Sequence, residues 1–502
     1  MQKMTRGGQG LSCAQLADFI GVDLLGKLAA THGRFHGEVY LTGGTIRDLL
    51  LGREPADIDL TVREDARGWA ADLARTTGGA YVPLGRDEDA ARVVWRGRSI
   101  DFSSFREGAV LIEEDLRKRD ITVNSLAVPV QGLWSGDEIL RSAAVRVIDP
   151  TGGLHDLAGQ CVRVTSARSF LSDPLRLLRV FRFAATHGFA VQQQTFDLVG
   201  RQRQLISRVA PERVAHELDL IMESPRAHAT FADMAAAGLL FAVLPELKAG
   251  VGIKQPASHH LDVFDHCLAT LQAMEKLQAD PARFFAGFSG VLRHYLENGR
   301  RRKQLKWAAL FHDLGKPATV AIREDRGGRI TFYNHDRAGA DLFTAIARRL
   351  RWSNADTTAV ADLIAFHMRP FHLCNVRRRG QLSLKACLRL IRLAGPSLPG
   401  LFLLGMADTL AGQGPGRPEQ IEREVADLFA HLEEVRGEYV EPVRSLPPLL
   451  TGRDLIDELH LVPGPVFREI LDTVAEAHME KKISSRREAL ALAVDLLGSG
   501  GR

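Results

Sequence analysis

The sequence predicts an α+β fold in which a small N-terminal part of mixed strands and helices precedes a longer, predominantly helical chain. Within residues 39–104, short apolar runs with a period of two are separated by Gly- and Asp-containing turns, which is typical of strands. From residue 161 onward, apolar positions recur at helical spacing. The 502 residues, 45% of them apolar, are enough for several domains with more than one packed core.

Composition argues against some classes of protein. No run of about eighteen apolar residues occurs, which argues against a transmembrane helix. The first residues, with Lys3 and Arg6, lack the apolar stretch of a secretory signal. The net charge of +4 permits nucleic-acid binding without indicating it. The five cysteines are Cys13, Cys161, Cys267, Cys374 and Cys387. They form no CxxC pair, which predicts reduced thiols in a cytoplasmic protein. We expect no membrane as a partner.

A glycine pair follows the first predicted strand. The expected elements are a helix over residues 11–33, a strand over Val39–Leu41, and an amphipathic helix that starts after Gly43-Gly44 and is closed by Gly52. Paired glycines let the backbone approach a bulky anion, and the helix start offers N–H groups to phosphate oxygens. Arg47, one turn into this helix, adds a fork of donors within reach of the same anion.

Two carboxylates lie on the next predicted strand. Side chains two apart on a strand point to the same face, so Asp57 and Asp59 project together while Ile58 and Leu60 enter the core. Neighbouring carboxylates repel each other unless a cation lies between them, and Mg²⁺ favours one or two carboxylates together with substrate phosphates. The adjoining glycine pair therefore favours a Mg²⁺ site over a solvated aspartate pair.

A third carboxylate is predicted on a hairpin. The next elements are a helix over Glu64–Thr76, a strand over Tyr81–Leu84, and the alternating segments Ala91–Trp95 and Ser99–Ser103 around a turn at Gly97. Asp101 on the last of these strands is expected beside Asp57 and Asp59.

An acidic cluster over residues 113–115 leads into a basic run that ends at Arg119. Together with Asp120 and Asn124, this stretch suits contacts to a ribose and a triphosphate. The alternative is a charged helix with i, i+4 ion pairs.

A helix with a basic side follows in the second third of the chain. Asp173 is expected as its N-cap, with Pro174 at the first helical position. Arg176, Arg179 and Arg182 then recur at helical spacing on one side. A carboxylate and a guanidinium at this spacing present an acceptor and donors to one base edge, which distinguishes cytosine or adenine from uracil or guanine. The alternative is a capped helix with a basic face.

A second set of metal-binding residue types begins near residue 256. His266 lies in the predicted helix Asp262–Met274, His312-Asp313 follow the apolar run Trp307–Phe311, and Asp408 ends the apolar helix Leu401–Ala407. These nitrogen and oxygen donors suit a divalent cation, and His335 and His367 are candidates for a second metal.

The order of these motifs resembles that of the tRNA nucleotidyltransferase and poly(A) polymerase family, bacterial class, of the polymerase β superfamily. The resemblance starts from Gly43-Gly44-x-x-Arg47-Asp48 and Asp57-Ile58-Asp59, and the later motifs follow in order. The resemblance implies a polymerase β-like head in which Asp57 and Asp59 hold two Mg²⁺ ions, with Asp101 as the third catalytic carboxylate. It also implies which residues bind the nucleotide: Gly43, Gly44 and Arg47 the triphosphate, Arg119, Asp120 and Asn124 the sugar and phosphates, and Asp173 with Arg176 the base, with Arg179 and Arg182 as further nucleotide-binding residues.

The resemblance implies CTP, with ATP as a second candidate, as substrate and the 3′ end of tRNA as acceptor. Many CCA-adding relatives carry a longer loop before the acidic cluster, which helps them to switch from cytidine to adenosine. Here residues 106–112 form only a short link, which resembles the CC-adding subgroup and implies a separate A-adding enzyme. The usual Glu-Asp pair of the base-selecting helix is Ser172-Asp173 in this chain.

The series His266, His312-Asp313 and Asp408 resembles the HD superfamily of metal-dependent phosphohydrolases, which implies a divalent metal and hydrolysis of terminal phosphates. The expected domains are a catalytic head over residues 1–160, a neck over 161–225, an HD domain over 226–440 and a tail over 441–502. Two other interpretations stay open, namely a poly(A) polymerase and an HD phosphohydrolase whose head only binds RNA.

Overall fold

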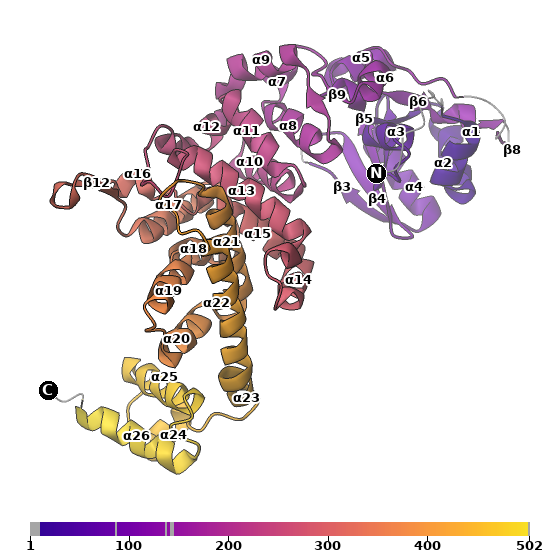
Figure 1. Cartoon of the computed structure of the whole chain (residues 1–502). Coiled ribbons are helices and arrows are strands. Elements are labelled where there is room, and N and C mark those ends of the chain that lie inside the picture. Colours follow the sequence, from indigo (N-terminus) through magenta and orange to yellow (C-terminus); the bar gives the residue numbers. More distant parts are fainter. Residues whose placement is uncertain (1–10, 86–87, 136–137, 141–144, 500–502) are drawn as a thin grey trace. The chain divides into compact units, whose positions relative to one another are not determined.

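The computed structural model describes residues 11–85, 88–135, 138–140 and 145–499 (Figure 1). Lys3 and Arg6, on which the expectation of no secretory signal rests, lie outside the described residues. The chain forms two compact units. The first comprises the chain up to residue 221 together with 233–243, and the second comprises 222–232 and everything from 244. The four-part division expected from the sequence stays a prediction.

A six-stranded mixed sheet forms the centre of the first unit. The strand order is β3-β4-β5-β2-β1-β6, and β2 runs parallel to β5 whereas every other neighbouring pair is antiparallel. The strands are β1 Val39–Thr42, β2 Asp57–Val62, β3 Ala80–Pro83, β4 Ala90–Trp95, β5 Arg98–Ser104 and β6 Ala127–Pro129. This sheet and the helices around it confirm the predicted α+β fold.

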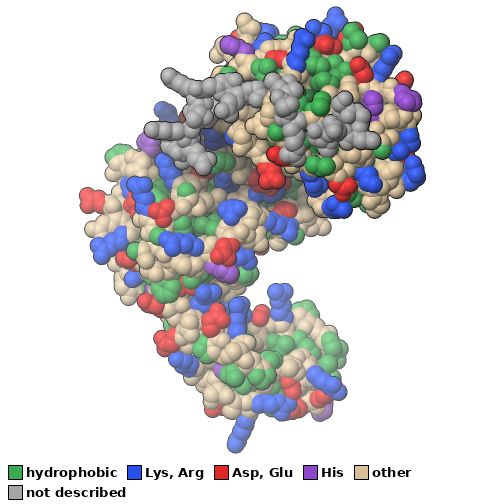
Figure 2. Space-filling view, turned by 90° about the vertical axis from the view of Figure 1, so that its right-hand side faces the viewer, with side chains coloured by type: hydrophobic (Ala, Val, Ile, Leu, Met, Phe, Trp, Pro, Cys, Tyr) green, Lys and Arg blue, Asp and Glu red, His purple; other side chains and the backbone are tan. Residues whose placement is uncertain are grey.

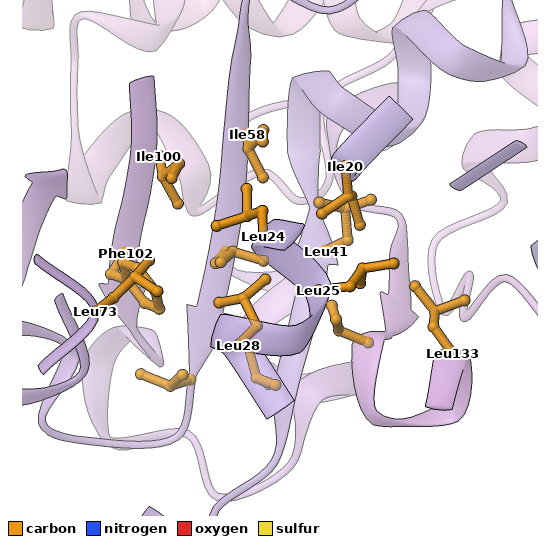
Figure 3. Packing of buried hydrophobic residues seen from close by; sticks show 14 of the residues in the cluster. Ile20, Leu24, Leu25, Leu28, Leu41, Ile58, Leu73, Ile100, Phe102 and Leu133 are labelled. Carbon is orange, nitrogen blue, oxygen red and sulfur yellow. The ribbon is translucent and has the colours of Figure 1, made fainter. Parts of the chain in front are cut away.

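Three amphipathic helices bury one face of this sheet. They are α1 Cys13–Ile20, α2 Val22–Phe35 and α4 Ala66–Thr77. Figure 3 shows Leu24 and Leu28 of α2 in one cluster with Ile58 of β2 and Phe102 of β5. Because side chains alternate along a strand, the burial of Ile58 turns its neighbours on β2 to the opposite, polar face.

The helix expected over residues 11–33 is wrong in one respect, because the chain breaks into α1 and α2. The break lies at Gly21, whose φ of +89° suits only glycine without strain. Arg98 closes the end of α1, since its Nη1 and Nη2 donate to the carbonyls of Ile20 and Phe19, each at 2.7 Å. The apolar period continues across Gly21, so the pattern alone suggested one helix.

The predicted hairpin around Gly97 is confirmed. β4 and β5 pair antiparallel, with Trp95 opposite Arg98. The two residues of the turn, Arg96 and Gly97, have φ of +49° and +76°, as in the type I′ turns whose twist matches that of the strands.

The remaining helices of the first unit connect the sheet to its helical part. These helices are α3 Gly43–Leu50, α5 Ile112–Arg117, α6 Gly153–Ala158, α7 Ser169–Ser172, α8 Arg176–His187, α9 Gln193–Gln202, α10 Pro211–Glu223, α11 Ala227–Ala236 and α12 Leu239–Val243. The division between the two units passes through α10 and α11. Short strand pairs are β7 Trp134–Ser135 with β8 Glu138–Ile139, and β9 Cys161–Val162 with β10 Ala190–Val191. α8 begins later than expected, because Pro174 and Leu175 form a turn, although Asp173 Oδ1 still accepts from Leu175 N at 3.2 Å.

Up to residue 499, the regular structure of the second unit is helical apart from one small hairpin, β11 Ala321–Arg323 with β12 Arg329–Thr331. Its helices are α13 Val263–Ala279, α14 Ser289–Glu297, α15 Gly299–Phe311, α16 Lys316–Thr319, α17 His335–Arg349, α18 Asn354–Phe366, α19 Arg369–Arg378, α20 Leu384–Ala394, α21 Leu398–Ala411, α22 Ile421–Val435 and α23 Glu441–Arg444. Helices α13, α15, α18 and α21 pack against one another. Among the predicted metal ligands, His266 lies on α13 and Asp408 on α21, and His312 and His367 directly follow α15 and α18.

One helical stretch in the described part of the chain has the length and hydropathy of a membrane span. Within Leu384–Ala411, which include α20 and α21, a window of 18 residues has a mean hydropathy of 1.4. However, 72% of this window is buried inside the protein, as in the core helix of a packed domain.

The tail has a small apolar core of its own. Its helices are α24 Gly452–Asp457, α25 Pro465–Met479 and α26 Arg486–Ser499, around Leu450, Leu455, Ile470, Val474, Ala489 and Ala493.

On the face drawn in Figure 2, Lys and Arg side chains are interleaved with acidic ones. Charge on that face therefore does not form a block of one sign.

Candidate active site and metal centre

Three carboxylates meet on the polar face of β2 and β5. The register places Asp59 directly opposite Asp101, and Asp57 precedes Asp59 by two residues on the same face. Burial raises the pKa of the Asp59 carboxyl, Arg119 opposes this, and the charges of Asp101 and Asp57 raise the pKa further. The predicted juxtaposition of the three carboxylates is confirmed, and their mutual repulsion fits a site that gains stability from a cation.

The glycine pair begins α3 directly against Asp59. Gly43 has φ of +66°, and a Cβ on it would lie 3.2 Å from Arg119 Nη1 and 3.4 Å from Asp59 Oδ2. A Cβ on Gly44 would also lie 3.4 Å from Asp59 Oδ2. Only glycine therefore leaves this space free between a helix start and a carboxylate.

Thr45 fixes α3 to β2. Its Oγ1 donates to the carbonyl of Asp57 at 3.1 Å and accepts from the N–H of Asp59 at 2.9 Å. The N–H of Gly43 donates to Leu126 O at 3.2 Å, so an incoming phosphate meets the later amides of the first turn of the helix. The sequence pattern gave no role to Thr45, because its hydroxyl acts through backbone groups of another element.

Arg92 is a charged residue of this site that the sequence analysis missed. Its Nε and Nη2 donate to the two carboxylate oxygens of Asp101 at 2.7 and 2.8 Å, and its Nη2 lies 3.6 Å from Asp57 Oδ2. A protein cation thus neutralises part of the carboxylate group. The signal lay in the hairpin register, which sets Arg92 opposite Asp101.

Arg119 lies buried just past the end of α5. Its Nε donates to Asp115 Oδ2 at 3.0 Å and its Nη2 to Thr61 Oγ1 at 2.9 Å. Asp115 also pairs with Arg106 at 3.0 Å. Burial alone would raise the pKa of Asp115, but Arg119 and Arg106 outweigh it and lower this pKa. The two arginines therefore hold Asp115 ionised inside the protein.

Asp120 and Asn124 connect α3 to α8. Asp120 Oδ2 accepts from Arg179 Nε and Nη2 at 2.9 and 2.5 Å, and Asn124 Oδ1 accepts from Arg47 Nη1 at 2.6 Å. Asn124 Nδ2 lies 3.4 Å from Asp120 Oδ1. One hydrogen-bonded chain thus joins Arg47, beside the glycine pair, to Arg179 of the predicted base-selecting helix.

The other base-selecting candidates also have protein partners. Arg176 Nη1 donates to Lys118 O at 3.0 Å and to Ser169 Oγ at 2.9 Å, Asp173 pairs with Arg213 at 3.2 Å, and Arg182 Nε lies 2.7 Å from Glu217 Oε2. Arg213 and Glu217 come from α10, which therefore clamps α8 in place. The roles of these residues in base selection stay predictions.

The four ligand candidates of the HD series converge in the second unit. Nε2 of His266, on α13, lies 3.0 Å from Asp408 Oδ1, on α21, and 3.6 Å from Asp313 Oδ2. Nε2 of His312 lies 3.1 Å from Asp313 Oδ2 and 3.8 Å from Asp408 Oδ1. Asp408 lies within its helix rather than at the end, because α21 continues to Ala411.

The candidates for a second metal gather at the other oxygen of Asp313. Nε2 of His335 lies 3.3 Å from Asp313 Oδ1, and Nε2 of His367 lies 3.8 Å from it. The two Nε2 atoms are 3.2 Å apart. Asp313 therefore faces one histidine pair with each carboxylate oxygen.

Backbone carbonyls fix three of these imidazoles. The carbonyl three residues earlier lies close to Nδ1 of each, at 3.0 Å for His312, 2.7 Å for His335 and 2.6 Å for His367. A carbonyl only accepts, so Nδ1 carries a hydrogen in each ring and Nε2 faces the site. Burial lowers the pKa of His367 to about 3, which keeps its ring neutral. The two imidazole nitrogens of His335 and His367 and Asp313 Oδ1 converge on one point, and this donor set fits a divalent cation.

Two more residues lie at this centre. The ring of His259 is 4.6 Å from that of His266, and its ligand atom lies close to those of His266 and Asp313. Lys316 Nζ is 2.5 Å from Asp313 Oδ2 and 2.6 Å from Gln255 Oε1. His259 lies outside any helix, so no periodicity linked it to the other ligands.

Comparison with known proteins agrees with this geometry. Residues 39–163 match the poly(A) polymerase head domain, residues 188–250 match the domain described as a probable RNA and SrmB-binding site of polymerase A, and residues 263–394 match the HD domain. The A-adding tRNA nucleotidyltransferase of Deinococcus radiodurans is 34% identical over 462 residues, which cover 90% of this chain and 94% of that protein. The chain belongs to the tRNA nucleotidyltransferase and poly(A) polymerase family. The present chain is also 31% identical over 470 residues to the CC-adding tRNA nucleotidyltransferase of Thermus thermophilus. The match covers 93% of this chain and 94% of that protein.

A solved CCA-adding enzyme in complex with ATP shares the fold of this nucleotidyltransferase. The TM-score is 0.62 at 18% identity, and the match covers 98% of each chain. The family resemblance seen in the sequence motifs is therefore confirmed, and with it the polymerase β-like head and the helical body. The protein is an enzyme of the nucleotidyltransferase class.

Proposed function

We propose that this enzyme adds two cytidines in succession from CTP to the 3′ end of a tRNA that lacks its CCA end, and releases pyrophosphate. The observation that carries the proposal is the group of Asp57, Asp59 and Asp101 against the glycine start of α3. Asp57 and Asp59 would hold Mg²⁺, which supplies the Lewis acid that in-line phosphoryl transfer uses. No side-chain nucleophile is required, because the ribose hydroxyl of the RNA attacks.

The surrounding residues bind and orient the nucleotide. The amides after Gly43, together with Arg47 and Arg119, bring positive charge to the triphosphate beside Asp59. Arg176, the first residue of α8, and Asp173, which precedes this helix, would exchange their present partners for the Watson–Crick edge of cytosine. The network of Asp120 and Asn124 keeps this base-binding helix at a fixed distance from the triphosphate.

The link over residues 106–112 favours CC addition. It is held as a turn: Arg106 N donates to Asp115 Oδ1 at 2.9 Å at one end, and Val110 N donates to Glu114 Oε2 at 2.8 Å near the other. A link tied at both ends leaves no free loop to rearrange the site between cytidine and adenosine. A-addition is the competing product, since the A-adding relative is about as similar to this chain as the CC-adding one.

Extension of a tRNA without its CCA end tests the proposal at single-nucleotide resolution. With CTP alone, or with CTP and ATP together, we expect two cytidines and no adenosine. Asp57→Asn and Asp59→Asn should each slow incorporation at least about 100-fold, whereas Asp23→Asn, an exposed control in the same unit, should not. Adenosine addition to a tRNA ending in CC would assign the A-adding subtype instead, and a long adenosine tail would assign a poly(A) polymerase. No incorporation would refute the transferase function.

We infer a second activity in the HD domain, the metal-dependent hydrolysis of terminal phosphate esters. The convergence of His266, His312, Asp313, His335 and Asp408 supports it. Phosphate release from a 3′-phosphorylated RNA should disappear in His312→Ala and persist in Asp57→Asn. If phosphate release persists while wild-type protein never incorporates CTP, the head only binds RNA.

The proposed partners are the 3′ end of tRNA, CTP, and a separate A-adding enzyme that acts on the same tRNA. A cytoplasmic location agrees with the cysteines, all five of which are free thiols.

A further inference from the structure

A large pocket adjoins the HD metal centre. Its volume is about 1110 Å³, and both Asp313 and Asp408 lie in its wall. The wall also includes β12, the start of α17, α19, and the segment after α21. Pockets that take one small ligand usually measure roughly 300–1,000 Å³. This pocket therefore exceeds what a single phosphate or mononucleotide needs.

The wall of the pocket is strongly basic. It contains seven lysines and arginines against three aspartates, two of which are metal-ligand candidates. Arg378 and Arg417 are neutralised by Glu424 and Glu422. Among the described residues, the side chains of four exposed pocket arginines have no ion-pair or hydrogen-bond partner: Arg329 on β12, Arg337 on α17, Arg369 on α19 and Arg379 directly after α19. Free cations in a concave site attract an anionic ligand, because the walls focus their field.

Three of these arginines extend from the metal ligands to the far end of α19. Arg337 follows His335 by two residues, and Arg369 follows His367 by two residues, and both arginines line the same pocket as Asp313. Arg379 caps the C-terminus of α19, which has ten residues. A helix of that length measures about 15 Å. One phosphate group at the metals cannot reach Arg379, but a chain of several phosphates can.

An aromatic side chain completes this surface. Tyr333 lies in the pocket wall two residues before His335, and it is 56% exposed. Basic residues along a groove with an exposed aromatic ring are the features by which proteins bind single-stranded nucleic acid without reading its sequence.

We propose that Arg337, Arg369, Arg379 and Tyr333, the basic trough, bind the end of a single-stranded RNA and set its terminal phosphate at the metal centre. The proposal rests on the phosphohydrolase activity proposed above and names its substrate class, an oligoribonucleotide rather than a free mononucleotide. Arg337 and Arg369 hold the terminal phosphate, Arg379 holds an internal phosphodiester, and Tyr333 stacks on a base.

The reaction at the end of this trough balances with water alone. Water adds to the phosphorus, and the bond between phosphorus and the ribose oxygen breaks. The ribose oxygen leaves as a hydroxyl after taking a proton from that water, and inorganic phosphate departs. Arginines beside the phosphate keep its oxygens in place during this exchange.

The first test measures phosphate release from 3′-phosphorylated oligouridylates of one to four nucleotides. We expect the KM to fall about tenfold between the mononucleotide and the trinucleotide, with little change in kcat, since an internal phosphate contact is worth a charge-assisted hydrogen bond. Arg379→Gln should remove this gain for the trinucleotide and leave the mononucleotide unchanged. Arg348→Gln, an exposed arginine at the far end of α17, is the matched control and should behave as wild type.

The second test measures binding without hydrolysis. Fluorescence anisotropy of a labelled 3′-phosphorylated trinucleotide is followed against salt in His312→Ala protein, which should not release phosphate. Each phosphate contact contributes a slope of about −0.7 to log K against log salt. Arg379→Gln in that background should reduce the slope by about one such contact.

The two tests separate the inference from the function on which it rests. If no oligonucleotide releases phosphate but binding still depends on Arg379, the phosphohydrolase function fails and the basic trough stands. If phosphate is released with a KM independent of length, or if Arg379→Gln matches Arg348→Gln in both tests, the basic trough is refuted.

Discussion

Gly43 and Gly52 lie on either side of the helical turns of α3 with nearly the same backbone conformation but different surroundings. Their φ angles are +66° and +67°, yet a Cβ would meet Arg119 and Asp59 at Gly43 and nothing within 4 Å at Gly52. Alanine at either position should cost about 1–2 kcal/mol of stability through the left-handed backbone. Only Gly43→Ala should also lose nucleotidyl transfer, because its methyl group enters the space for the triphosphate.

Thermal unfolding and tRNA extension on both variants check this prediction. Equal stability losses with activity lost only in Gly43→Ala support the proposed triphosphate site. Equal activity in both variants would mean that the start of α3 does not hold the triphosphate.

Asp120 gives a pH-dependent contribution to stability. Burial would raise its pKa, but the ion pair with Arg179 outweighs burial and holds the pKa below the usual value. A depressed folded pKa means that the stabilisation is fully present above the unfolded pKa, about 3.9, and is lost as the pH falls through the folded value. Breaking a buried pair costs about 3–5 kcal/mol, and since 34% of the Arg179 side chain is exposed, we expect about 2–3 kcal/mol for Asp120→Asn at pH 7.

Chemical denaturation across pH measures this difference. The gap in unfolding free energy between wild type and Asp120→Asn should be constant from pH 7 to about 5 and should close below about pH 4. A gap that widens toward low pH would contradict the ion pair.

At the scale of elements, Arg98 joins the hairpin to α1. Its two hydrogen bonds to the carbonyls of Phe19 and Ile20 close the helix where Gly21 breaks the chain. Hydrogen bonds of a charged group are worth about 1.5–3 kcal/mol, so Arg98→Ala should destabilise the protein by that amount. Arg98→Lys should recover less than half, because an ammonium does not bridge both carbonyls with a planar fork. An Arg98→Ala protein with wild-type unfolding would show that Gly21 alone ends α1.

The elements that could be predicted are those with a local cause. Period-two alternation around Asp57 and Asp59 located β2, and Gly97 located the hairpin, because both depend on residues a few positions apart. The break at Gly21 and the late start of α8 were missed, since they depend on closing contacts from Arg98 and on a turn at Pro174. Arg92 was missed for the same reason, as its role appears only once β4 and β5 are in register.

At the scale of the whole molecule, the two constellations should work independently. His312→Ala should lower the bound divalent metal and abolish phosphate release, yet leave CTP incorporation intact. Asp59→Asn should abolish CTP incorporation and leave phosphate release intact. Metal analysis of purified protein and both assays on both variants check the prediction, and the loss of both activities in either variant would contradict independent sites.

Whole-molecule features were predicted only as far as ordered motifs carry them. His266, His312, Asp313 and Asp408 were assigned together because their types and order identify an HD site. Two further features depend on how the second unit packs. Asp313 faces a histidine pair with each oxygen, and His259 joins the metal centre. The basic trough also depends on packing, since its arginines come from α17 and α19, which are separated in the chain by α18.

The carbonyl anchors of His312, His335 and His367 have a consequence for ion exchange. Each ring is tied to its own backbone at a helix terminus, so it cannot swing aside unless that terminus unwinds. A cage of this rigidity suits an ion with metal–nitrogen distances of about 2.0–2.1 Å better than Ca²⁺ with its longer bonds. The same anchors determine the dissociation rate, because a bound ion leaves only as fast as the ends of α15 and α18 open locally.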